Sequence, residues 1–206
     1  MMKRSITINA IELATAYHSG QKRMDKIDYI IHPARVALYA RTMLESISDV
    51  EIEKYFNMTR SEVEAASWLH DTIEDTSISD AEISERTSKA VLSVVRELTS
   101  DVEEIAKIGK SSYLIQKINK MSLVAFFLKL CDRYDNVSGL EFAKRKFADR
   151  YCLETEQILQ GIDLPKTDNY EINNLYEDLV LMIKKELSDY RLSQTKEIKN
   201  EEFANS

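Results

Sequence analysis

The chain has 206 residues, of which 44% are hydrophobic and 31% are charged, a balance typical of soluble globular proteins and too apolar for a disordered chain. The net charge of −7 argues against broad binding to nucleic acid, which requires a basic surface, although a few local cations or a metal ion would still accommodate an anionic small molecule. With only 4 Gly and 2 Pro, the chain has few turn residues, which favours long helices over a β-rich fold.

The distribution of apolar residues predicts an all-α fold, a helical bundle of about ten helices. We expect these helices at about 6–19, 33–48, 51–57, 60–74, 80–86, 88–100, 111–120, 122–137, 140–160 and 171–190. Capping-box patterns begin two of them, at Thr59 with Glu62 and at Ser79 with Glu82. One domain is expected over residues 1–192, followed at 193–206 by a polar tail that we expect to fray.

The N-terminal segment is polar within its first nine residues, and no apolar run approaches the ~18 residues that a membrane span needs. The two cysteines, Cys131 and Cys152, do not form a disulfide framework. We therefore expect a cytoplasmic protein with no membrane partner. Its oligomeric state is left open.

Three segments carry side chains that could bind a metal ion. His32 precedes Pro33 at the expected start of a helix, where a capping or half-buried histidine is the simpler interpretation. In SWLHDTIEDTS, His70 and Asp71 follow an apolar run, although acids are unfavourable near a helix C-terminus. In FFLKLCDRYDNVSGL, Asp132 ends a nearly all-apolar helix, where a carboxylate is costly unless it is paired or bound to a metal.

Taken together, these segments offer two imidazoles and two carboxylates, from His32, His70, Asp71 and Asp132. A mixed nitrogen and oxygen set without thiolates suits Mn²⁺ or Fe²⁺ and permits Mg²⁺ or Zn²⁺. A solvated acidic helix end and a surface ion pair remain the alternatives for the second and third segments.

The combination of IIHP, HDTIEDT and KLCDRYDN resembles the HD-domain hydrolases of the RelA/SpoT type, the (p)ppGpp 3′-pyrophosphohydrolases, over about Ala10 to Ile162. The resemblance implies a small single-domain HD fold. It also implies that the four side chains above bind a divalent metal, usually Mn²⁺, while Glu74 and Asp75 orient or deprotonate the attacking water. The implied substrate-binding residues are Arg23, Asn136, Lys107, Lys110, Tyr113 and Lys117.

The implied activity is hydrolysis of guanosine tetra- or pentaphosphate to GDP or GTP plus pyrophosphate, so that the expected partner is a small nucleotide substrate and not a nucleic acid. The sequence departs from the family at Met24, where a lysine is common, and at Gly139, where many members carry a threonine. These departures leave open a different nucleotide, such as ppApp or a deoxynucleotide. A catalytically inactive HD module that binds a nucleotide or a partner protein is a third alternative.

Overall fold

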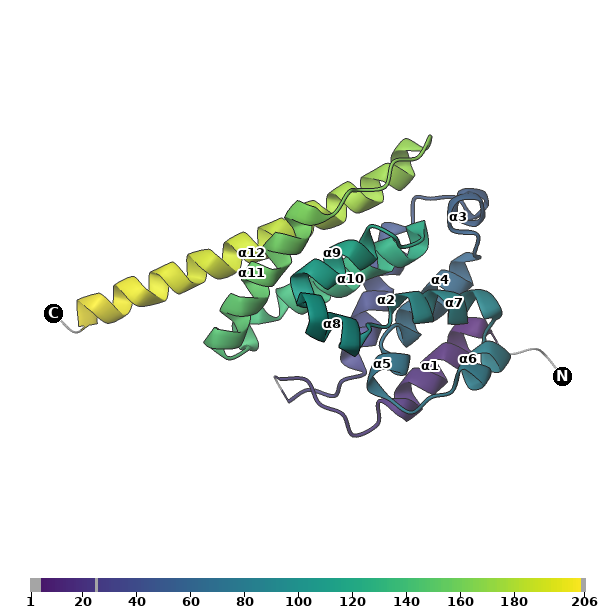
Figure 1. Ribbon diagram of the computed structural model, residues 1–206, viewed down its shortest axis with the longest axis horizontal. Helices are drawn as coiled ribbons and strands as arrows, with labels where there is room; N and C mark the ends of the chain where they lie inside the picture. The colour runs from purple at the N-terminus through teal and green to yellow at the C-terminus, as the bar shows by residue number, and fades with distance from the viewer. Residues whose placement is uncertain (1–4, 25, 205–206) are drawn as a thin grey trace.

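The structure, a computed structural model, describes residues 5–24 and 26–204, and this part of the chain contains helices but no β-strand. The prediction of an all-α fold is confirmed, with twelve α-helices in the described residues against the ten or so expected. They are α1 (Ile6–Tyr17), α2 (Ile31–Met43), α3 (Asp49–Phe56), α4 (Arg60–Leu69), α5 (Thr72–Asp75), α6 (Asp80–Arg86), α7 (Lys89–Leu98), α8 (Val102–Ile108), α9 (Lys110–Ile118), α10 (Leu123–Ser138), α11 (Arg145–Gly161) and α12 (Tyr170–Ala204) (Figure 1).

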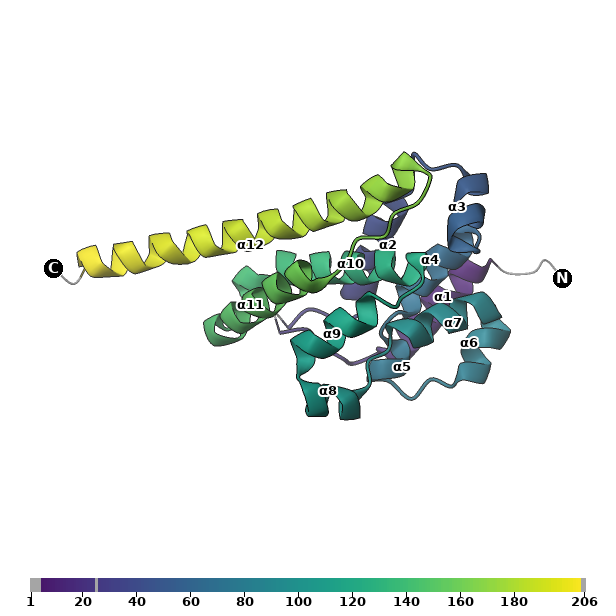
Figure 2. The ribbon, with the colours of Figure 1, turned by 45° about the horizontal axis from the view of Figure 1, so that its top comes forward.

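Helix α10 runs through the middle of the bundle, packed against α2, α7 and α12 (Figure 2). Its apolar residues point in nearly every direction, so that Phe126, Phe127 and Leu128 are all buried to 2% exposure or less. Burial continues past this apolar stretch to Asp132, Arg133 and Asp135. The central helix therefore carries charged groups into the interior, where each one requires a partner.

The predicted helix over residues 60–74 is wrong as a single element, because it divides at His70 into α4 and α5. Side chains compete here for carbonyls that would otherwise continue the helix: His70 Nδ1 donates to the carbonyl of Ser67, and Thr72 Oγ1 donates to that of Leu69. The backbone of Asp71, at φ −101° and ψ −5°, then turns into α5. The break redirects the two candidate ligands relative to a straight helix.

The capping box expected at the start of α4 is confirmed. Thr59 and Glu62 form both hydrogen bonds of a capping box at the start of α4. Gly109 lies between α8 and α9 with a φ of 81°, a conformation that glycine adopts without a steric penalty. Helix α8 was not predicted, and Asp101 begins it by accepting a hydrogen bond from the amide of Glu104.

Helix α12 buries Ile172, Leu175, Tyr176, Leu179 and Ile183 at helical spacing. Its C-terminal end extends beyond the other helices (Figures 1 and 2), and it runs to Ala204 through the segment expected to fray. That segment contains good helix formers and neither Gly nor Pro, so nothing local ends the helix. The domain boundary at residue 193 stays a prediction, and Asn205 and Ser206 lie outside the described residues. No helix within the described ranges has both the length and the apolar character needed to cross a membrane.

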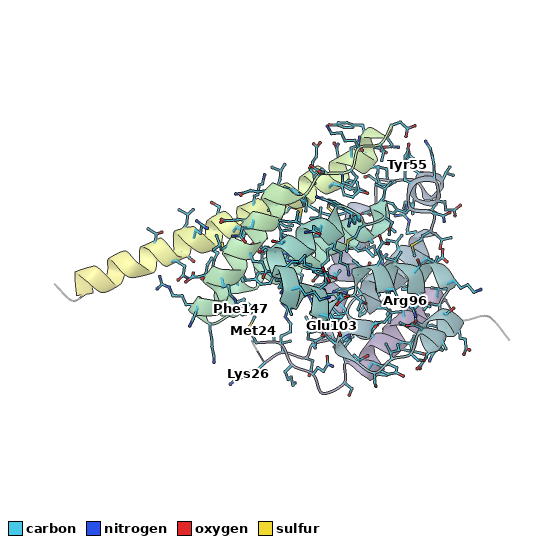
Figure 3. The ribbon with its side chains drawn as sticks, in the orientation of Figure 1. Met24, Lys26, Tyr55, Arg96, Glu103 and Phe147 are labelled. Atoms are coloured by element: carbon cyan, nitrogen blue, oxygen red, sulfur yellow. The ribbon has the colours of Figure 1, made fainter. Side chains whose placement is uncertain are left out.

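The connection between α1 and α2 folds back on itself through an isolated β-bridge between Lys22 and Asp28. It lies at the edge of the molecule, where Figure 3 labels Met24 and Lys26. The amide of Tyr29 donates to the carbonyl of Gln21, and the side-chain amide of Gln21 donates to the carbonyl of Asp75. We call residues 18–24 and 26–30 the entry loop; the first bond closes the loop on itself, and the second attaches it to the end of α5.

Candidate metal centre

Four side chains from three parts of the chain gather in the interior beside the entry loop. One ligand atom from each of His32, His70, Asp71 and Asp132 lies within 4.8 Å of all the others. The two imidazoles face each other through their Nε2 atoms, 3.2 Å apart, and Asp71 Oδ2 lies 3.1 Å from that of His70. The structure therefore brings together the set identified in the sequence, in an arrangement able to hold one divalent ion.

Each ligand reaches this point for a local reason. Helix α2 begins at Ile31, so His32 lies in its first turn, where Pro33 removes an amide that has no helical partner. The break between α4 and α5 presents His70 and Asp71 together, and α10 contributes Asp132 at the end of its apolar run.

Hydrogen bonds fix the orientation of both imidazoles. His32 Nδ1 lies 2.6 Å from Asp135 Oδ2, and His70 Nδ1 lies 2.8 Å from the carbonyl of Ser67. An acceptor at Nδ1 places the proton there, which leaves the Nε2 lone pair free to bind a metal. Both Nε2 atoms face the carboxylates of Asp71 and Asp132, at 3.1 to 3.8 Å.

The charges in the cluster are strongly interdependent. Burial lowers the pKa of His70, but the charge of Asp71 and a hydrogen bond with Asp132 outweigh it and raise that pKa to about 9. Burial likewise opposes protonation of His32, whose pKa the three neighbouring carboxylates nonetheless raise well above its ordinary value. The pKa values of Asp71 and Asp132 are held well below normal against burial, chiefly by His70 for Asp71 and by Lys129 for Asp132. The buried carboxylates thus require positive charge, which protons or a cation can supply.

Asp132 has two further partners on its own helix. Lys129 Nζ lies 2.9 Å from Oδ2, and Asn136 Nδ2 donates to Oδ1 at 2.6 Å. Asn136 was predicted to contact the nucleotide; here its amide supports the candidate ligand, and it is still partly exposed. Lys129 was not singled out in the sequence. Its position at i−3 from Asp132 was the available signal.

Glu74 and Asp75 both lie on α5, but they face different partners. Asp75 Oδ2 is 3.0 Å from the hydroxyl of Tyr29, which is itself 2.6 Å from Asp71 Oδ2. Glu74 Oε2 accepts a hydrogen bond from the amide of Ser100 at 2.8 Å. Partial burial and the charge of Asp71 raise the pKa of Asp75. Asp75 is therefore linked to the cluster, whereas Glu74 contacts the connection between α7 and α8.

The predicted phosphate-binding residues divide into two groups. Tyr113 and Lys117 contact the connection before α8: the Tyr113 hydroxyl accepts from the amide of Asp101, and Lys117 Nζ donates to the carbonyl of Thr99. Burial and the charge of Lys129 lower the pKa of Lys117. Lys107 and Lys110 are exposed, and they pair with Glu104 at 3.2 Å and Glu154 at 3.6 Å.

Arg23, the predicted cation near the substrate, extends inward from the entry loop. Its Nη1 lies 2.9 Å from Asp135 Oδ2, and its side chain is only 13% exposed. A Cβ added at Gly139 would lie 3.7 Å from Arg23 Nη2, so the guanidinium also covers the end of α10. Asp135 was not identified in the sequence, although its place three residues after Asp132 put it on a related face of the same helix.

The model of the HD domain family matches residues 29–137, more than half of the chain, including all four candidate ligands. A guanosine-3′,5′-bis(diphosphate) 3′-pyrophosphohydrolase of Aquifex aeolicus is 32% identical over 155 residues, which cover 72% of this chain and 20% of that protein. An enzyme of the same description from Xenopus tropicalis is 27% identical over 139 residues, which cover 66% of this chain and 70% of that protein. The chain spans only 21%, 29% and 20% of the length of three bacterial relatives.

Among solved structures, a metazoan ortholog of SpoT that hydrolyses ppGpp matches with a TM-score of 0.63 and 22% identity, over 87% of this chain and 96% of that one. At this identity the likeness shows a shared fold. The resemblance drawn from the IIHP, HDTIEDT and KLCDRYDN segments is confirmed at the level of the family. The chain belongs to the HD domain family.

Proposed function

We propose that this protein is a metal-dependent phosphohydrolase that removes the 3′-pyrophosphate from guanosine tetra- or pentaphosphate. The products are GDP or GTP and pyrophosphate. The observation that carries this proposal is the cluster of His32, His70, Asp71 and Asp132, in which only Asp71 is partly exposed and both Nε2 atoms face the two carboxylates. The substrate class is supported by the names of the relatives from Aquifex aeolicus and Xenopus tropicalis.

In this proposal the four side chains of the cluster hold one divalent ion, for which Mn²⁺ is our assignment because the donors are two imidazoles and two carboxylates. When bound, such an ion lowers the pKa of water and offsets negative charge on phosphate oxygens. Asp135 and the carbonyl of Ser67 hold the imidazoles in the tautomer that leaves Nε2 free.

Asp75 and Glu74 orient the attacking water, and Asp75 accepts its proton. The raised pKa of Asp75 makes it a stronger base than an ordinary aspartate, and Tyr29 links it to Asp71 in the cluster. The water oxygen forms a bond to the phosphorus attached to O3′, and the bond from that phosphorus to O3′ breaks. The 3′ oxygen leaves with the nucleoside and takes up a proton. Because water is the nucleophile, no covalent enzyme intermediate forms.

We assign substrate binding to cations and polar side chains around the cluster. In this assignment Arg23 is a cation near the substrate and Asn136 contacts the nucleotide end, while the phosphates are bound by Lys107, Lys110, Tyr113 and Lys117. Partly buried cations suit this role, because a charge-assisted hydrogen bond to phosphate is stronger where water is excluded.

The test is a hydrolysis panel with identified products, run on purified protein with and without Mn²⁺. We expect ppGpp to yield GDP and intact pyrophosphate only with the metal, and His70→Ala or Asp71→Ala to abolish the activity. The exposed Asp178→Asn substitution on α12 serves as the control. Full activity in either ligand variant would refute the proposal.

The same panel tests the alternatives that Met24 and Gly139 suggest. Preference for ppApp would show that the substrate carries adenine and not guanine. Preference for a deoxynucleotide without a 3′-pyrophosphate would show that the enzyme catalyses a different class of hydrolysis. A protein that never binds a divalent ion, even after reconstitution, would instead be an inactive binding module.

A further inference from the structure

The carboxylate of Asp135 is fully buried, and three side chains converge on it. Its Oδ2 lies 2.6 Å from His32 Nδ1 and 2.9 Å from Arg23 Nη1, and its Oδ1 lies 2.9 Å from Arg35 Nε. These partners come from different places: α2 provides His32 and Arg35, and the entry loop provides Arg23. A single carboxylate on α10 therefore connects a candidate metal ligand with a candidate substrate cation.

The two oxygens of Asp135 have different surroundings. Oδ2 accepts hydrogen bonds from the imidazole and the Arg23 guanidinium together, whereas Oδ1 lies at ion-pair distance from Arg35 Nε without a hydrogen bond. A buried carboxylate without donors and cations would be strongly destabilised, so His32, Arg23 and Arg35 together compensate the charge of Asp135. An amide at this position would replace one acceptor with an NH₂ group and would turn it toward one of the donors.

The contacts of Asp135 fix the orientation of His32 and of Arg23. The hydrogen bond at Nδ1 fixes the rotation of the His32 ring and directs Nε2 toward Asp71 and Asp132, both 3.3 Å away. The ion pair holds Arg23 inward from the entry loop and engages only Nη1 of a group with five N–H donors, so the others can contact a ligand. The side chain keeps 13% of its surface exposed, which gives a ligand access to it.

We propose that Asp135 is a positioning residue that links the metal centre to substrate binding, by orienting His32 for the ion and by fixing Arg23 for an anionic nucleotide. The role of Asp135 in fixing Arg23 for substrate rests on the proposed function. Its role in orienting His32 does not, because that role concerns only the imidazole and a divalent ion.

The test compares the wild-type protein with Asp135→Asn, which keeps the size of the side chain, and with Asp178→Asn as a matched substitution on an exposed face of α12. Circular dichroism first establishes that each variant is folded. Calorimetric titration of the metal-free proteins with Mn²⁺ then measures affinity without any substrate. We expect Asp135→Asn to weaken Mn²⁺ binding about 10–100-fold, the usual effect of losing a partner of a ligating histidine, and Asp178→Asn to leave it unchanged.

A folded Asp135→Asn protein that binds Mn²⁺ as tightly as the wild type would overturn the inference. If that substitution unfolds the protein, Asp135→Glu replaces it in the titration: the longer side chain keeps the charge but displaces the oxygens, and unchanged affinity there would also overturn the inference. Absence of ppGpp hydrolysis in the wild type would remove the proposed function and leave this titration as the decisive test.

The role of Asp135 in fixing Arg23 is tested at saturating Mn²⁺ with a double-mutant cycle between Arg23→Gln and Asp135→Asn. We expect each substitution to raise KM for ppGpp more than it lowers kcat, and the double variant to be little worse than either single one. Additive effects on KM would show that Asp135 does not act through Arg23. A merely structural role would lower the melting temperature without this dependence between the two residues.

Discussion

The hydroxyl of Tyr29 lies 2.6 Å from Asp71 Oδ2, between this candidate metal ligand and Asp75, whose Oδ2 is 3.0 Å away. A phenol has one proton to donate, so it can serve only one of the carboxylates at a time. The shorter distance assigns that proton to Asp71. Burial and the charge of Asp71 raise the pKa of Tyr29 far above its ordinary value, so the hydroxyl stays protonated as a donor.

Replacement of Tyr29 by phenylalanine removes this donor while keeping the ring that packs against His18 and His32. We expect a drop of roughly 10–100-fold in Mn²⁺ affinity or in kcat/KM, because Asp71 loses a partner that orients it. Tyr170→Phe, at a tyrosine that is 77% exposed, is the control. Wild-type affinity and turnover in Tyr29→Phe would show that the hydrogen bond has no role in the site.

Addition of Mn²⁺ should stabilise the fold, since the ion binds a cluster that exists only in the folded chain. At a metal concentration 100 times Kd, mass action contributes about 2.7 kcal/mol, which raises Tm by roughly 5–10 °C for a domain of this size. Differential scanning calorimetry with Mn²⁺ and with a chelator measures the change. Asp132→Asn should remove most of it, and an equal shift in that variant would place the ion elsewhere.

The affinity for Mn²⁺ should rise with pH. In the metal-free protein His70 has a pKa of about 9, so below that value the ion must displace a proton from the imidazole. Affinity should therefore increase by about tenfold per pH unit for each displaced proton as the pH rises toward the pKa of His70, and the raised pKa of His32 adds a second proton to be displaced.

Titration calorimetry at several pH values, in buffers with different ionisation enthalpies, measures both the affinity and the protons released. An affinity that is constant over this range, with no proton release, would mean that His70 is already neutral without the metal.

Gly161, the last residue of α11, packs directly on α9. A Cβ at this position would lie 2.6 Å from Cδ1 of Ile115 and 2.9 Å from its Cγ1. We expect Gly161→Ala to destabilise the fold by about 1–3 kcal/mol through this overlap. In an Ile115→Ala background the overlap disappears, and the same substitution should be neutral or stabilising because glycine is a poor helix former. Urea denaturation of the wild type, the two single variants and the double variant measures whether the effect of Gly161→Ala on the free energy of unfolding changes sign.

Much of the fold follows from local sequence. The spacing of apolar residues located most helices, and the capping box of Thr59 and Glu62 marked the start of α4, because these signals act within one or two turns. Helix α8 was missed because it is short and buries no residue, so that it leaves no apolar period in the sequence. The extension of α12 to Ala204 was missed because a polar composition was taken to mean fraying, although its residues favour a helix.

The identity of the candidate ligands follows from the sequence: two histidines and two aspartates that suit a divalent ion, in segments typical of the HD domain family. The way in which these side chains are held depends on contacts between distant segments. The break after His70, the contact of Tyr29 with Asp71, and the convergence of Arg23, Arg35 and His32 on Asp135 join residues up to 112 positions apart. Such contacts depend on how α2, α10 and the entry loop pack together, and no periodicity within one segment encodes that packing.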